Sequence, residues 1–204
     1  MIGQALRNKS SVDRVRQSSM HWRMSSAVVL AAGALAAGLI SAAAIAQSGY
    51  SPGPQNVNLP ADYQSRFIRY ATVDKPDRKI IRFLYINPEA FAAVNKSQPF
   101  ASGTVLIMED HAARLDAAGA PMRDQQGRMI PLPAVAGIFI QEKRTGWGVG
   151  YAETMRNGEW EYARFNPDGT RHSGPVTNCF DCHLKLRKDQ DFTFNLWDYV
   201  QARP

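Results

Sequence analysis

The chain carries little net charge outside its first segment, and this limits its partners. Of its 204 residues, the first 46 hold five basic side chains against a single acidic one, Asp13. The remainder holds 19 basic and 17 acidic side chains, so the main part of the chain is nearly neutral. Domains that bind nucleic acid carry a strongly basic patch. We therefore expect no nucleic-acid partner.

The sequence also shows no internal repeat, no βαβ alternation and no set of four long helical periods. It contains instead short runs of β-branched and aromatic residues, separated by Gly, Pro, Asn and Asp, which is the pattern of short strands. We predict strands at residues 66–73, 79–86, 103–109, 137–143, 147–153, 159–165 and 192–196. Few helices are predicted, so the expected class is α+β, predominantly an antiparallel sheet with short helices packed on it.

Turn and cap signals refine this prediction. Asn157-Gly158 favours a type I′ hairpin turn before the strand at 159–165, because both residues accept the positive φ that this turn demands. Asn87, followed by Pro88, is expected to cap a short helix. A second helix is expected over residues 177–189, with Thr177 or Asn178 as its cap, and residues 110–134 are expected to form a long insertion with at most a helical turn or two.

An uncharged apolar run, residues 27–46, follows the basic opening segment and ends in Ala44-Ile45-Ala46. A basic segment, an apolar run and a small-x-small site are typical of a signal peptide. No Arg-Arg pair precedes the run, which favours the general secretory route. We expect residues 1–46 to be this signal, 47–60 a linker and 61–204 the folded domain, exported to the periplasm. Twenty apolar residues also suffice to span a bilayer, so an uncleaved anchor is the alternative.

Only two cysteines are present, Cys179 and Cys182, and His183 follows directly. A thioredoxin-like disulfide needs this spacing at the start of a helix in a βαβ unit, which is absent. A zinc site needs a fourth ligand, and only His111 and His172 remain to supply it, beside nearby carboxylates. A structural disulfide suits an exported protein but does not call for the histidine.

Covalent haem attachment explains all three residues. The two thiols add to the two vinyl groups of haem, and the next residue, His183, lies under the iron as its axial ligand. This attachment takes place outside the bacterial cytoplasm, in agreement with the export signal. We predict one covalent haem c, held by Cys179, Cys182 and His183.

Two classes of haem protein do not fit the order of residues along the chain. All seven methionines precede Cys179, whereas the small helical cytochromes place the motif near the start and a methionine ligand downstream. The four-helix cytochromes c′ have the motif near the C-terminus but need four long helices.

A β-rich domain with one C-terminal haem motif resembles the cytochrome P-460 family, which includes the cytochrome c′-β branch. The resemblance covers residues 63–196 and rests on "RFLYIN", "GTVL", "GWG" and "NCFDCHLKLRKDQDFTF" in that order. It implies a homodimer and a five-coordinate haem whose open face binds small ligands such as nitric oxide or hydroxylamine. The alternatives are an electron carrier with Met108 or His111 as sixth ligand, served by a redox partner protein, and an enzyme that oxidises hydroxylamine or nitric oxide.

Within that family, the hydroxylamine-oxidising members carry a lysine, bonded to the porphyrin, on the strand after the G-x-V-L pattern. Met108 stands at that place here and cannot form the same bond. Strand alternation puts Thr104, Leu106 and Met108 on one face, so we expect Met108 to face the haem as a wall or a weak ligand. His111 and His172 are otherwise expected at the surface, and the following aromatic residues are expected in the core: Phe83, Phe139, Trp147 and Phe165.

Overall fold

The structure is a computed structural model, and it describes residues 51–96 and 99–203. The predicted signal segment, and the first part of the predicted linker, lie outside the described residues. Among the described residues, no helix is both long and apolar enough to cross a membrane.

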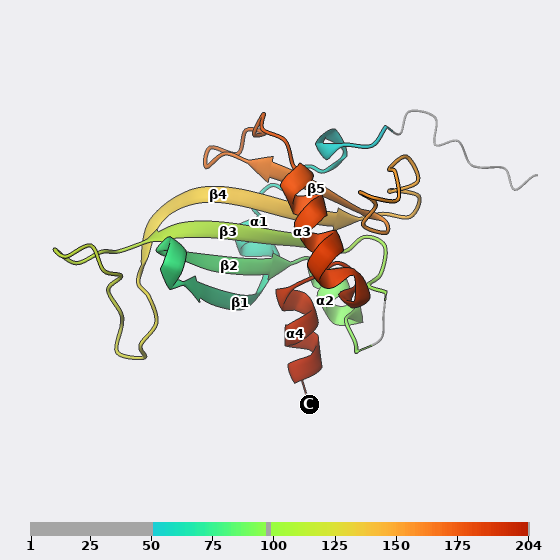
Figure 1. The fold of residues 1–204 in the computed structure, drawn as a ribbon. Helices are drawn as coiled ribbons and strands as arrows, with labels where there is room; N and C mark the ends of the chain where they lie inside the picture. Colours follow the sequence, from blue (N-terminus) through green and yellow to red (C-terminus); the bar gives the residue numbers. More distant parts are fainter. Residues whose placement is uncertain (1–50, 97–98, 204) are drawn as a thin grey trace, which may run out of the picture. The chain divides into compact units, whose positions relative to one another are not determined.

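A five-stranded antiparallel sheet forms the centre of the fold, with its strands in chain order, β1-β2-β3-β4-β5 (Figure 1). The strands are β1 (Ile68–Lys75), β2 (Ile80–Ile86), β3 (Val105–Ala113), β4 (Pro131–Lys143) and β5 (Trp160–Phe165). The helices are α1 (Tyr63–Arg66), α2 (Pro88–Ala93), α3 (Thr177–Arg187) and α4 (Asn195–Ala202), with 3-10 turns η1 (Pro54–Asn56), η2 (Pro76–Arg78) and η3 (Lys188–Gln190). The predicted α+β class is confirmed.

The two faces of the sheet bury different sets of side chains. Side chains alternate between the faces of a strand. Leu106 packs with Phe180 of α3 and Leu196 of α4, and we call this side the helix face. Ile107 points the other way and packs with Tyr63 of α1, on what we call the opposite face. Figure 1 shows α3 and α4 lying across one side of the sheet.

Two of the predicted strands are wrong. Residues 147–153 form turns, because Gly146 and Gly148 adopt φ of 86° and 88°, which a strand cannot continue through. Residues 192–196 do not form a last strand either. Phe192 has a φ of 57°, and α4 begins at Asn195, where the side chains of Leu196 and Val200, four residues apart, enter the core together.

The expected hairpin at Asn157-Gly158 is also wrong. Gly158 has a positive φ but Asn157 does not, and no strand precedes it. Asn157 is fully buried, and its amide nitrogen donates to the Phe180 carbonyl of α3 at 3.0 Å. It therefore ties α3 to the start of β5.

The predicted position of the α2 cap is confirmed, whereas the cap of α3 differs from the prediction. Asn87 is the N-cap of α2 by backbone position, but its side chain accepts the Val105 N–H at 2.8 Å and so joins α2 to β3. Thr177 is the first residue of α3, whose N-cap is Val176 without a capping side chain.

The predicted insertion is shorter than expected, because β3 runs on to Ala113 and β4 begins at Pro131. The connection contains turns and the isolated bridges Leu115↔Pro121 and Arg123↔Met129, and no helical turn. Asp74 of β1 holds it: the carboxylate pairs with the Arg128 guanidinium at 2.9 Å and accepts the Met129 N–H at 2.9 Å.

Candidate functional site

Helix α3 presents the three residues of the motif. Positions three and four apart share one side of a helix, so Cys179, Cys182 and His183 point in similar directions. Cys179 is half-buried against the core, Cys182 is exposed, and both are free thiols. Burial raises the pKa of Cys179, which keeps this sulfur protonated at neutral pH. Within the described residues, no three His, Cys, Asp or Glu side chains are grouped to hold a metal ion, so no protein-only zinc site is formed.

His183 is oriented by its surroundings. Its ring lies against Tyr162 and Phe194, with centroids 4.9 and 4.8 Å away. Its Nδ1 is 2.6 Å from the Phe192 carbonyl oxygen. A carbonyl only accepts, so Nδ1 carries the proton and Nε2 is the atom with a free lone pair. Burial lowers the pKa of His183, which favours the neutral ring that binds a metal.

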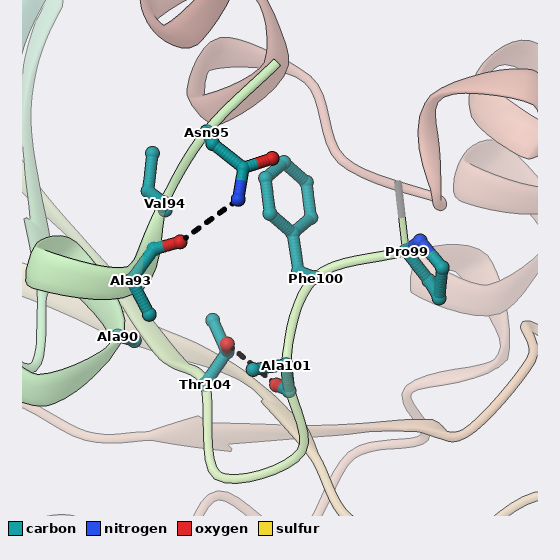
Figure 2. Close-up of a pocket in the computed structure, with 8 residues that line it drawn as sticks. All are labelled: Ala90, Ala93, Val94, Asn95, Pro99, Phe100, Ala101 and Thr104. Atoms are coloured by element: carbon teal, nitrogen blue, oxygen red, sulfur yellow. Dashed lines mark hydrogen bonds between the residues drawn. The ribbon is translucent and has the colours of Figure 1, made fainter. Parts of the chain in front are cut away.

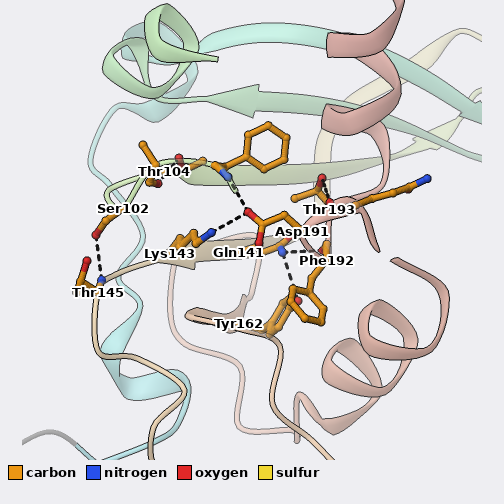
Figure 3. Close-up of polar contacts among 12 residues, drawn as sticks. Ser102, Thr104, Gln141, Lys143, Thr145, Tyr162, Asp191, Phe192 and Thr193 are labelled. Atoms are coloured by element: carbon orange, nitrogen blue, oxygen red, sulfur yellow. Dashed lines mark hydrogen bonds and ion pairs between the residues drawn. The ribbon is translucent and has the colours of Figure 1, made fainter. Parts of the chain in front are cut away.

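The Phe192 carbonyl is itself held by a buried polar network (Figure 3). Asp191 and Phe192 both adopt left-handed conformations, with φ of 45° and 57°. The Asp191 carboxylate accepts the Phe100 N–H at 2.8 Å and pairs with the Lys143 ammonium at 2.7 Å. Gln141 donates its amide N–H to the Phe192 carbonyl at 2.9 Å. The network fixes the acceptor that orients His183.

The sequence did not predict the roles of Gln141, Lys143 and Asp191. The first two lie on β4, within the predicted strand "GIFIQEK", and Asp191 follows η3. The available signal was the polar Gln141 and Lys143 at alternate positions, on a face that otherwise enters the core.

Met108 lies on the helix face of the sheet, as predicted from its alternation with Leu106. It is half-buried between Leu84 of β2 and Phe139 of β4 in the strand register. Phe139 is also half-buried, and the Arg164 guanidinium lies 5.3 Å from its ring centre. These side chains form a partly open apolar area on the face that carries α3.

His111 is not a surface residue, contrary to the prediction. It is buried on the opposite face, where its Nε2 lies 2.6 Å from Glu109 and its Nδ1 lies 2.9 Å from the Leu132 carbonyl. Glu109 also accepts hydrogen bonds from Tyr63 and Gln64. The sheet thus lies between His111 and His183. His172 is half-buried in a turn, where its Nδ1 accepts the Gly174 N–H.

Two cavities of the structure lie away from the motif and from Met108. The smaller, of about 120 Å³, lies between α2 and the segment before β3 (Figure 2) and is lined by Ala90, Ala93, Val94, Asn95, Pro99, Phe100, Ala101 and Thr104. The larger, of about 500 Å³, adjoins it and includes Arg66 and Arg144. Neither is lined by the motif or by Met108, so the candidate site is the helix face itself.

An antiparallel sheet that faces a helix with two free thiols and an oriented imidazole is suited to a haem protein. The chain matches the family model of cytochrome P460 over residues 60–195, which include all five strands and α3. The chain therefore belongs to the cytochrome P460 family and is a haem-binding cytochrome. A comparison with curated proteins found no match.

Proposed function

We propose that the protein is an exported mono-haem c-type cytochrome that binds nitric oxide or a related small ligand. Cys179 and Cys182 hold the haem through thioether bonds, and Nε2 of His183 binds the iron. The observation that carries this proposal is the pairing of a neutral, oriented His183 with two free thiols on one side of α3. A haem iron with one protein ligand leaves a position open to small molecules.

The helix face supports the choice of a small neutral ligand. Half-buried Met108 and Phe139 offer apolar contact on the helix face. The alternative of an electron carrier rests on Met108, since its thioether sulfur is the candidate sixth ligand that remains once His111 is assigned to the opposite face.

Covalent attachment is tested by extraction with acidified acetone. We expect the colour to remain with the protein, and Cys179→Ser with Cys182→Ser to release haem into the organic phase. Colour in the organic phase from the unmodified protein would contradict the proposal.

Ligation is tested by His183→Ala, with His172→Ala as the matched control. The first should keep the haem attached but change the spin state of the iron, because the thioethers remain and the axial bond is lost. The second should leave the spectrum unchanged. An unaltered spectrum in His183→Ala would mean that another residue binds the iron.

Ligand binding is tested by adding nitric oxide to the ferrous protein. A high-spin spectrum that changes on addition supports an open iron position. A low-spin spectrum that does not change, and that becomes high-spin in Met108→Leu, would support the electron carrier.

Export is tested by sequencing the N-terminus of periplasmic protein, which we expect to begin near Gln47.

A further inference from the structure

One backbone oxygen at the candidate site accepts two hydrogen bonds. The Phe192 carbonyl receives Nδ1–H of His183 at 2.6 Å and the amide N–H of Gln141 at 2.9 Å. We propose that Gln141 is a positioning residue that weakens the His183 hydrogen bond and thereby raises the reduction potential of the haem iron. The inference rests on the proposed ligation of iron by His183.

Gln141 is placed to hold this contact permanently. Its side chain lies on the helix face of β4, and the residue is only 8% exposed. The same amide nitrogen lies 3.3 Å from the Tyr162 hydroxyl, and the Tyr162 ring packs on His183. The amide is therefore fixed between two groups that both contact the histidine.

The acceptor cannot move aside to escape the second donor. Asp191 and Phe192 are held in left-handed conformations by the buried pair with Lys143 and by the Phe192 N–H, which donates to the Arg187 carbonyl at 2.8 Å. A Cβ at Gly158 would lie 3.1 Å from the half-buried Phe192 ring, so this ring packs closely against Gly158. The carbonyl oxygen thus has a fixed position, and its two donors share its electron density.

The second hydrogen bond to the Phe192 carbonyl is expected to reduce electron donation from His183 to the iron. When a histidine binds a metal through one ring nitrogen, a strong acceptor for the N–H of the other ring nitrogen raises the basicity of the ring. The ring is then a better electron donor to the metal. A stronger donor stabilises ferric over ferrous iron. By withdrawing density from the carbonyl, Gln141 makes it a weaker acceptor for His183. Removal of the amide should therefore strengthen the histidine bond and favour the ferric state.

The experiment compares Gln141→Met with the unmodified holoprotein, and uses Gln126→Met, in the exposed turn between β3 and β4, as the control. The midpoint potential and the ferrous iron–histidine stretching band in the resonance Raman spectrum are measured. We expect a lower potential, equivalent to about a twofold to tenfold shift of the ferric–ferrous equilibrium if the change is worth a fraction to the whole of one hydrogen bond. We also expect the stretching band at higher frequency. The control should match the unmodified protein.

The outcomes separate this inference from the function on which it rests. An iron–histidine band that is present in the unmodified protein but unmoved in Gln141→Met, with an unchanged or raised potential, overturns the role of Gln141 alone. The absence of the band from the five-coordinate ferrous protein overturns the ligation by His183 and the inference together. Gln141→Leu, close in volume to glutamine, serves as the second variant if the Met variant does not accumulate, with the same expected direction.

Discussion

Breaking the buried pair between Lys143 and Asp191 should strongly destabilise the fold. The two residues are 4% and 8% exposed, and the ammonium nitrogen lies 2.7 Å from the carboxylate. In Lys143→Met, the carboxylate of Asp191 would keep one donor, the Phe100 N–H at 2.8 Å. A buried charge left without its ionic partner costs about 3–5 kcal/mol. This is a large part of the roughly 5–15 kcal/mol that stabilises a typical domain.

The double variant Lys143→Met/Asp191→Asn separates the charge effect from the loss of packing. Asparagine accepts the left-handed conformation found at position 191 and can still accept the Phe100 N–H. Replacing both members of a buried pair with neutral groups is often close to neutral for stability. We therefore expect the double variant to recover more than half of the free energy lost in Lys143→Met.

Urea unfolding of the holoprotein, followed by tryptophan fluorescence, measures this effect. With a slope of roughly 2 kcal/mol per molar urea, Lys143→Met should lower the midpoint by about 2 M. Lys185→Met is the control, because its pair with Asp181 is largely exposed and should contribute less than about 0.5 kcal/mol. A loss below about 1 kcal/mol in Lys143→Met, or a double variant less stable than the single one, would refute the reasoning.

Three further predictions concern other parts of the fold. Asn157→Ala should lower the free energy of unfolding by about 0.5–1.5 kcal/mol in thermal denaturation, because it removes the hydrogen bond that the buried amide donates to the Phe180 carbonyl. The hydrogen bond with Arg128 lowers the pKa of Asp74, so this tether is present at neutral pH and is lost as the pH falls through that lowered pKa. Hydrogen exchange of residues 114–130, measured relative to the intrinsic rate at each pH, should rise in that range, and in Asp74→Asn at pH 7. Mass spectrometry of the haem peptide should show no third covalent link, since Met108 is the residue expected where other family members carry the cross-linked lysine; a porphyrin joined to a lysine-containing peptide would contradict this.

The sequence predicted the strands where local preference and tertiary packing agree. β2 was located within one residue, because its β-branched and aromatic run is bounded by turn residues on both sides. Residues 147–153 also alternate between bulky and small side chains, but Gly146 and Gly148, both with positive φ, bend the chain away from the sheet. Residues 192–196 have strand-like composition, yet burial of Leu196 and Val200 against the helix face requires helical spacing. Contacts with residues distant in the sequence determine the structure of these two segments, and the local sequence does not show which residues those are.

The candidate site was likewise predicted only in part from the sequence. The haem motif could be found because Cys179, Cys182 and His183 are adjacent in the chain and their spacing is itself the signal. Lys143 and Asp191 are 48 residues apart, and Gln141 and Phe192 are 51 apart, so their contacts depend on the register of β4 beneath the turn after α3. Nothing in the local sequence of either segment indicates its partner.

The distribution of charged groups between the two faces of the sheet bears on which chemistry the iron can support. Oxidation of hydroxylamine releases protons and therefore needs a base near the substrate. Beside Met108 in the strand register lie Leu84 and Phe139, neither of which accepts a proton. The next carboxylate along β3 on this face, Asp110, is paired with the Arg82 guanidinium at 2.9 Å. Glu109 and its histidine partner point to the opposite face. The side chains around Met108 therefore agree better with the proposed binding of a small neutral ligand than with proton-coupled oxidation.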